Sequence, residues 1–156
     1  MAVTGKDETL ESVFRAVRLC FGNLRVIGDA LHADIGITSA MRAVMESLAP
    51  DHAATVPEIA RSKLVSRQNV QVLVDALAAK RMVETRPNPA HKRSPLVALT
   101  PLGRETFDAM RQREAALLAE LAGDIPAAAL DETLATLTAL LRRLESESSR
   151  TNRPAS

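Results

Sequence analysis

Aromatic residues are scarce in this sequence. Trp and Tyr are absent and Phe occurs three times, while the apolar positions are mostly Ala, Leu and Val. This composition favours helices over an aromatic-rich β-sandwich. Hydrophobic residues still make up 46% of the 156 residues, which is enough to bury the core of one small domain. We therefore expect a mainly α fold.

Signals of metal binding and catalysis are also missing. Cys20 is the only cysteine, which excludes an intrachain disulfide and a zinc site built from several thiolates. The histidines lack paired-ligand spacing, and Asp29 and Asp34 near His32 make only a weak metal candidate. The sequence has no phosphate-binding glycine loop, nucleophile elbow or His-Glu-x-x-His motif. We expect no enzyme, no metal and no cofactor.

Long hydrophobic runs are absent as well. No run approaches the roughly 20 apolar residues that span a bilayer. The first ten residues are polar and lack the basic and apolar regions of a signal peptide. We expect a cytoplasmic protein that has no membrane partner.

Basic residues concentrate in the middle of the chain. The net charge is only +1, yet residues 61–104 hold nine basic residues against two acidic ones. The basic residues are Arg61, Lys63, Arg67, Lys80, Arg81, Arg86, Lys92, Arg93 and Arg104. A basic middle between acidic ends is expected if the middle meets phosphates. A solvated basic face is the alternative.

The first part of the chain predicts one long helix, over about residues 7–32. Its apolar residues recur at steps of three and four. They are Val13, Val17, Cys20, Leu24, Ile27 and Leu31. A terminal helix of this length has little within a small domain to cover it, so we expect this stripe to be buried against a second subunit.

Three helix starts follow, each with its own cap. Gly36 interrupts the first pattern, and Thr38 caps a helix whose apolar residues are Met41, Val44, Met45 and Leu48. Thr55 and Glu58 form a capping box for a short helix over residues 56–61. After a break at residues 63–65, Ser66 caps a helix that runs to residue 80.

The helix after Ser66 has two different faces. Val70, Leu73, Val74 and Leu77 form a narrow apolar stripe. The other side shows Arg67, Gln68, Asn69 and Gln71, which can donate and accept hydrogen bonds. Asn and Gln can pair bidentately with adenine, and Arg can contact guanine or a phosphate. Two helices joined by a tight turn, the second with this face, indicate a helix-turn-helix; a merely solvated face is the alternative.

A β-hairpin is predicted after this helix. Residues 82–86 and 96–100 are short extended runs, and three prolines between them exclude a helix. The connection is long and basic, and we interpret the hairpin as a wing. Arg93, with Lys92, would lie along or in a minor groove of DNA, where the negative potential favours a cation. A mobile surface loop is the alternative.

Two more helices end the sequence. Thr100 caps the first, with Pro101 in its first turn, and Gly123 stops it after about residue 121. The last, over about residues 126–147, has a seam of leucines spaced by four and three, as in a coiled coil. This seam is Leu130, Leu134, Leu137, Leu141 and Leu144. Intrachain packing is the alternative to dimerisation for these leucines.

The predicted organisation is one structural domain. Residues 1–35 form an N-terminal dimerisation helix, and residues 36–104 form a winged helix-turn-helix lobe. Residues 105–147 form C-terminal dimerisation helices, and residues 148–156 form a flexible tail. The predicted contacts to double-stranded DNA are Lys63, Ser66, Arg67, Gln68, Asn69, Gln71, Arg86, Lys92 and Arg93. The predicted dimer contacts are Val13, Val17 and the five leucines of the seam.

In order and spacing, four segments resemble the MarR (multiple antibiotic resistance regulator) family of transcription regulators. They are Gly-Ile-Thr at residues 36–38, Val-Pro-Glu-Ile-Ala at residues 56–60, residues 66–77, and Leu-Val-Ala-Leu-Thr-Pro-Leu-Gly at residues 96–103. The resemblance covers nearly the whole chain. It implies a DNA-binding homodimer, formed by the first and the last two helices, on a pseudo-palindromic operator. A repressor role is expected.

The sequence departs from the family pattern at two places. Arg81 stands where members usually have Gly at the end of the recognition helix, so the left-handed cap must be strained or replaced. The wing usually carries Asp before two basic residues, but here the run is His91-Lys92-Arg93. The usual bracing of the wing arginine is therefore in doubt.

The resemblance also implies an effector, because many relatives bind small aromatic or phenolic acids beside the DNA-binding lobe. Arg18, His32 and Arg42 are candidate carboxylate partners for such an effector, with Met41 and Met45 as adaptable apolar lining. Ordinary surface or packing residues are the alternative for each of them. Two other interpretations stay open. One is a winged helix that binds protein instead of DNA. The other is a redox-responsive regulator that uses Cys20, although we expect a buried, inert thiol.

Overall fold

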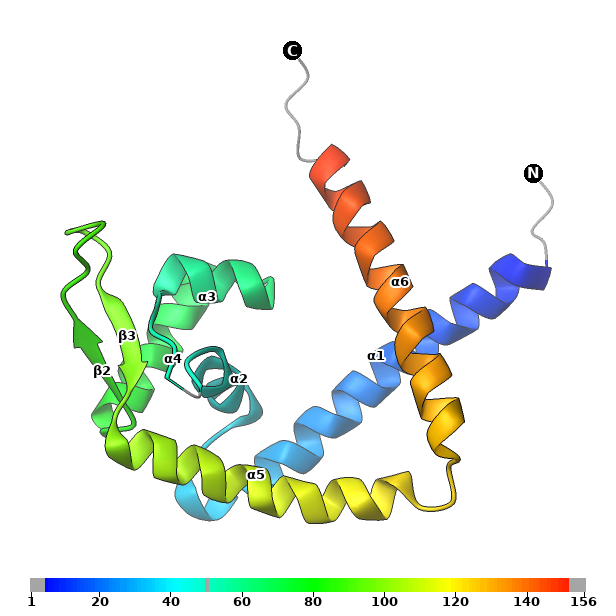
Figure 1. The fold of residues 1–156 in the computed structure, drawn as a ribbon, viewed down its shortest axis with the longest axis horizontal. Coiled ribbons are helices and arrows are strands. Elements are labelled where there is room, and N and C mark those ends of the chain that lie inside the picture. The colour runs from blue at the N-terminus through cyan, green and yellow to red at the C-terminus, as the bar shows by residue number, and fades with distance from the viewer. Residues whose placement is uncertain (1–4, 50, 152–156) are drawn as a thin grey trace. The chain divides into compact units, whose positions relative to one another are not determined.

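The computed structural model describes residues 5–49 and 51–151. The chain is mainly helical with a small antiparallel sheet (Figure 1), as predicted. In chain order the elements are α1 (Gly5–Leu31), η1 (Ala33–Ile35), α2 (Ser39–Ser47), β1 (Ala54–Thr55), α3 (Val56–Lys63), α4 (Arg67–Ala79), β2 (Val83–Arg86), β3 (Leu96–Leu99), α5 (Pro101–Ala122) and α6 (Ala127–Thr151). No helix in the described ranges is long and apolar enough to cross a membrane.

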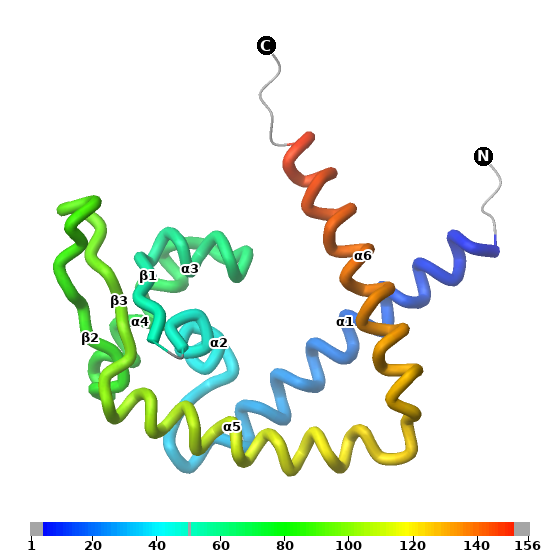
Figure 2. Tube along the Cα trace, viewed as in Figure 1, coloured from blue at the N-terminus to red at the C-terminus, as the bar shows by residue number. Residues whose placement is uncertain are grey.

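Two compact units divide the chain within α5, between Glu114 and Ala115. The first holds the helix-turn-helix and the sheet, and the second holds the rest of α5 and all of α6 (Figure 2). The predicted boundaries at residues 35 and 104 stay predictions. Helix α6 continues through Thr151, four residues past its predicted end. The predicted flexibility of residues 148–151 stays a prediction, and the remainder of the predicted tail lies outside the described residues.

The hydrophobic core belongs to the first unit. It joins residues of α2, α3, α4, the sheet and the first half of α5. Its most deeply buried side chains include Met45, Leu48, Ile59, Val70, Leu77, Leu99 and Met110. The apolar stripes predicted for α2 and α4 supply much of this core, so spacing at the helical period identified the inner faces of these helices.

The helix starts lie at the predicted caps. Thr38 Oγ1 accepts the Met41 N–H at 3.2 Å, and Ser66 Oγ accepts the Asn69 N–H at 3.1 Å. The capping box is present, with the Thr55 N–H donating to Glu58 Oε2 at 2.7 Å. Hydrogen bonds from the Thr55 backbone and hydroxyl lower the pKa of Glu58. Caps satisfy backbone donors at helix starts, and this local chemistry is why the sequence predicted them.

Other elements also differ from the prediction. The short helix α3 continues two residues past the predicted end, through Lys63. A 3-10 turn, η1, follows α1 and was not predicted. Strand β1 was also not predicted, because it has only two residues and exists through pairing with β3, with Ala54 opposite Val97.

The sheet order is β1-β3-β2, with both pairings antiparallel. The β2–β3 pairing aligns Val83 with Leu99 and Arg86 with Leu96, which makes the predicted hairpin. Helix α5 begins directly after this hairpin, and Thr100 Oγ1 accepts the Gly103 N–H at 2.9 Å. A Cβ at Gly103 would lie 1.9 Å from the Met82 carbonyl oxygen. Only glycine therefore allows this approach of α5 to the hairpin base.

Candidate nucleic-acid interface

A tight turn joins α3 to α4. Leu64 adopts a left-handed conformation, with φ of 55°, and its side chain is 89% exposed. The Val65 N–H donates to the Ala60 carbonyl at 3.0 Å, and the Leu64 N–H donates to the Arg61 carbonyl at 3.3 Å. These two bonds close the end of α3 in the manner of a Schellman motif. The turn then delivers Ser66 to cap α4, which confirms the predicted helix-turn-helix.

The outward face of α4 is polar and accessible. Arg67, Gln68, Asn69 and Gln71 are all exposed, as a base-reading role requires. Two further residues share this surface and were not predicted. Val72 is 61% exposed, and Asp75 Oδ1 accepts a hydrogen bond from Gln71 Nε2 at 2.8 Å. Helical periodicity could have found both, because they lie opposite the buried stripe of α4.

Arg81 confirms the strain expected at the end of α4. Its φ is 59°, in the left-handed region that favours glycine. The Met82 N–H donates to the Leu77 carbonyl at 2.9 Å, and the Arg81 N–H donates to the Ala78 carbonyl at 2.8 Å. This is a complete Schellman motif, so the cap forms in spite of the arginine side chain. Of the two expected outcomes, a strained left-handed cap or a different cap, the structure shows the strained one.

The wing loop has internal hydrogen bonds centred on Asn88. Its Nδ2 donates to the Ser94 carbonyl at 2.9 Å, and its Oδ1 accepts the Ala90 N–H at 3.1 Å. Lys92 and Arg93 are exposed, and within the described ranges neither forms an ion pair with a carboxylate. Asn88 thus supplies order in the loop where the acidic residue of the family pattern is missing.

Two of the predicted DNA contacts already have carboxylate partners. Lys63 Nζ lies 2.8 Å from Glu46 Oε2, and Arg86 Nη2 lies 2.7 Å from Glu84 Oε1. The Lys63 hydrogen bond is the largest cause of the lowered pKa of Glu46. Both pairs are partly exposed, where ion pairs stabilise little. Either cation can therefore exchange its partner for a phosphate at small cost.

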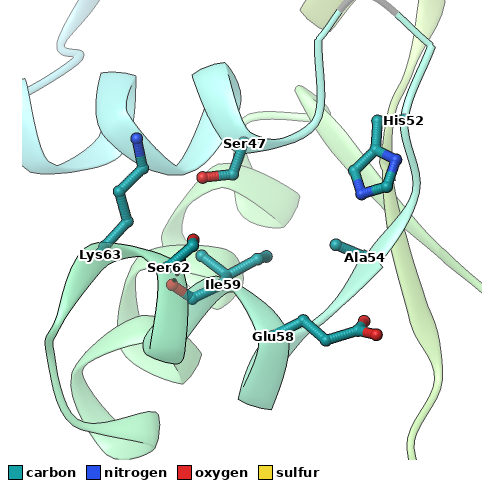
Figure 3. Close-up of a pocket in the computed structure, with 7 residues that line it drawn as sticks. All are labelled: Ser47, His52, Ala54, Glu58, Ile59, Ser62 and Lys63. Carbon is teal, nitrogen blue, oxygen red and sulfur yellow. Dashed lines mark hydrogen bonds between the residues drawn. The ribbon is translucent and has the colours of Figure 1, made fainter. Parts of the chain in front are cut away.

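A shallow cavity of about 350 Å³ lies beside Lys63 (Figure 3). It is lined by Ser47, His52, Ala54, Glu58, Ile59, Ser62 and Lys63, from α2, α3 and the segment between them. Most of the charged and hydroxyl side chains that line it already form hydrogen bonds within the protein. Ser62 Oγ, for example, donates to the Ile59 carbonyl at 3.0 Å. None of the predicted effector residues lines it.

Two predicted effector residues meet at a third residue that was not predicted. His32 is fully buried, and its Nε2 lies 3.0 Å from Glu114 Oε1. Arg42 Nη2 donates to Glu114 Oε2 at 2.6 Å, and Arg42 Nε contacts the other carboxylate oxygen. Burial raises the pKa of Glu114, but the hydrogen bonds from Arg42 and His32 outweigh it and hold this pKa below its usual value. In the described part of the chain, no hydrogen-bond partner faces His32 Nδ1.

The other predicted effector residues lie elsewhere. Met41 and Met45 are 6% and 0% exposed and belong to the core. Arg18 is exposed on α1. Asp29 and Asp34, the weak metal candidates, bind Ser39 and Arg113 instead. Among the residues that the structure describes, no group of three metal-ligating side chains is present.

The predicted dimer contacts are largely uncovered in the single chain. In α6, Leu134 and Leu141 are 66% and 58% exposed, Leu130 and Leu144 are also exposed, and Leu137 is half-buried. In α1, Val17 is exposed and Val13 is half-buried. Cys20 is exposed, so the prediction of a buried thiol is wrong for the single chain. No residue of α1 is buried in the single chain, because nothing in the same chain covers the apolar stripe to which Cys20 belongs.

The sequence is similar to a known protein family and to a protein of another organism. A family model described as "MarR family" matches residues 40–94. An uncharacterized protein of Mycobacterium tuberculosis is 36% identical over 126 residues, covering 81% of this chain and 87% of its own length.

Solved structures extend the likeness to nearly the whole chain. The crystal structure of a MarR family transcription regulator is 26% identical with a TM-score of 0.80, covering 96% of this chain and 99% of that one. A MarR mutant from Escherichia coli, crystallised with operator DNA, is 25% identical with a TM-score of 0.71, covering 87% and 95%. Members of this family are transcription regulators and not enzymes. This chain, with its helix-turn-helix and wing, belongs to the MarR family of transcription regulators.

Proposed function

We propose that the chain acts as a homodimeric repressor that binds a pseudo-palindromic DNA operator. The observation that carries this proposal is the pairing, within one compact unit, of the exposed polar face of α4 with a basic hairpin. Helix α4 also contacts β2, so the reading helix and the wing share one framework. The structure of the Escherichia coli relative with operator DNA supports the same use of the fold.

In each half of the proposed dimer, α4 and the wing contact different grooves of the DNA. Helix α4 enters the major groove, where Gln68, Asn69 and Gln71 meet base edges and Arg67 meets guanine or a phosphate. Arg93 and Lys92 approach the neighbouring minor groove. The remaining proposed contacts bind the sugar-phosphate backbone of the DNA and fix the position of the protein on the duplex without reading its sequence. They are Lys63, Ser66 and Arg86.

The exposed apolar residues of α1 and α6 support the dimer. An isolated chain would leave the leucine seam of α6 largely in water. Full burial of an exposed leucine contributes about 1.5–3 kcal/mol, and these partly exposed leucines would each gain a fraction of that when a partner covers them. A two-fold pair places its two recognition helices about one DNA turn apart, which is why the proposed operator is pseudo-palindromic.

A small aromatic or phenolic acid is proposed to relieve repression. His32 and Arg42 already bind one carboxylate, that of Glu114, which supports their use as carboxylate partners. An effector acid would compete with Glu114 for Arg42, while Arg18 offers a second cation on α1. Met41 and Met45 lie in the adjoining core and would have to shift to line its ring.

DNA binding is tested by fluorescence anisotropy with labelled DNA, since the chain has no Trp or Tyr to report on it. The duplexes are the region upstream of the protein's own gene and a scrambled control, each at two salt concentrations. We expect at least about a hundredfold preference for the upstream duplex and a steep loss of affinity with salt. Weak, equal and salt-insensitive binding to both duplexes and to a random-sequence pool would contradict the proposal and favour a protein-binding winged helix.

The exposed thiol keeps a second candidate, redox control through Cys20. Peroxide treatment would then weaken operator binding by the wild type and leave Cys20→Ser unchanged. Equal responses of the two proteins would exclude this candidate.

A further inference from the structure

Gln71, Val72 and Asp75 are three exposed residues of α4. Gln71 donates to Asp75 at 2.8 Å, and Val72, directly after Gln71, is 61% exposed. The buried residues of the same helix are Val70, Val74 and Leu77. At 3.6 residues per turn, Val72 and Asp75 lie on the side opposite this buried stripe, the side that the proposed function turns toward DNA.

Asp75 determines which way the Gln71 amide points. An ionised carboxylate only accepts hydrogen bonds, so the NH2 group of the amide must face Asp75. The carbonyl oxygen of Gln71 and its second N–H are then free to face a ligand. One acceptor beside one donor is the pattern that matches the N6 and N7 atoms of adenine. A carboxylate on this face repels phosphates, so its use to DNA binding lies in positioning Gln71 and not in attraction.

Val72 adds an apolar surface beside this amide. A β-branched side chain loses rotamer freedom in a helix, so an exposed helical position gives valine no local advantage. In the major groove, however, the C5-methyl of thymine is the apolar feature that a branched side chain can cover. Gln71 and Val72 are consecutive in α4 and lie about 1.5 Å apart along the helix axis, which is less than the roughly 3.4 Å between base pairs. The methyl that Val72 covers is therefore expected beside the base that Gln71 reads.

We propose that Gln71, oriented by Asp75, reads an adenine in each operator half-site, and that Val72 contacts the methyl group of a thymine at an adjacent base pair. This inference rests on the proposed DNA-binding function and adds the base chemistry that the second turn of α4 selects. Val72 and Gln71 are specificity-determining residues, and Asp75 is a positioning residue.

Uracil substitution tests the Val72 contact, because it removes the thymine methyl and leaves the pairing edge intact. An operator is first selected from random duplexes, and its thymines are then replaced one at a time. In each half-site, one thymine should be sensitive: its replacement by uracil should lower the affinity of the wild type about fourfold. Replacement of that thymine in both half-sites should lower the affinity about sixteenfold. Val72→Ala should bind the thymine duplex more weakly and show no further loss on uracil. Thymines outside the half-sites are the control.

The outcomes separate this inference from the function on which it rests. Selection of a specific duplex, followed by indifference of the wild type to uracil at every thymine, would overturn the Val72 contact and leave the regulator intact. Selection of no preferred duplex would overturn the proposed function itself, and the base contacts with it.

Asp75→Asn tests the positioning of Gln71. A carboxamide can donate or accept, so the Gln71 amide would no longer have one enforced orientation. We expect the preference for adenine over guanine at one base pair to fall by about tenfold. Asp108→Asn removes the same charge from an exposed position on α5 and should keep that preference, even if both variants bind every duplex more tightly. Equal discrimination by the two variants would overturn the role of Asp75.

Discussion

Helices α4 and α6 carry similar apolar patterns but differ in what covers them. In α4, Val70, Val74 and Leu77 are at most 2% exposed, because α2, α3 and the sheet surround them. In α6 no residue is buried, and the leucine seam is largely in solvent. Helical periodicity therefore identifies an apolar face but does not say whether the same chain or another one covers it.

The largest expected effect comes from the covered side of this comparison. Leu77→Ala should lower the free energy of unfolding by about 2–5 kcal/mol, because it leaves a cavity in the core. Chemical denaturation followed by circular dichroism measures this at fixed protein concentration. Leu134→Ala is the matched control in α6; a loss as large as that of Leu77→Ala, and independent of protein concentration, would mean that α6 packs on its own chain.

Substitutions in the exposed leucine seam of α6 should change the oligomeric state of the protein. Leu134→Glu combined with Leu141→Glu should weaken dimerisation on the order of a hundredfold or more, since charges replace leucines in the proposed interface. Sedimentation measures the dimer, and circular dichroism checks that the helices remain. A variant that stays dimeric at the same concentrations would place the interface away from the seam.

An intermediate effect is expected at the cluster of His32, Arg42 and Glu114. Glu114→Gln should cost about 1–3 kcal/mol at neutral pH, because it weakens charge-assisted hydrogen bonds. The pKa of Glu114 is lowered in the folded chain, so this contribution is complete above the unfolded value of about 4.3 and is lost as pH falls through the folded pKa.

The gap in free energy of unfolding between the wild type and Glu114→Gln should close as the pH is lowered from 7 to 3. The exposed Glu105→Gln on the same helix should show no such gap. A gap that is constant with pH would mean that the charge of Glu114 does not contribute.

The smallest effect is a gain. Arg81→Gly should raise the free energy of unfolding by about 0.5–1 kcal/mol, because glycine adopts the left-handed cap without strain. Thermal unfolding would show an increase of a few degrees. Arg81→Ala removes the same charge but keeps the strain, so an equal gain in both variants would assign the effect to charge.

Local chemistry explains what the sequence predicted well. The caps at Thr38, Thr55, Ser66 and Thr100 each depend on residues within three positions of one another, so a single sequence contains the whole interaction. The polar face of α4 and the left-handed strain at Arg81 follow from equally local patterns.

Contacts between distant segments could not be predicted in this way. Glu114 lies 72 residues from Arg42 and 82 from His32, and nothing in the spacing of these residues joins them. Strand β1 exists only through its pairing with β3. The expected burial of Cys20 failed for the related reason that a stripe of apolar residues does not identify its cover.

Position 103 has a consequence for how this protein can vary. Because the α5 backbone approaches the Met82 carbonyl closely, every side chain larger than hydrogen collides with the main chain at the base of the wing. Backbone atoms cannot rotate aside as a flexible side chain would. The loop of the hairpin can therefore change its sequence, while the position where α5 meets the base of the hairpin accepts only glycine.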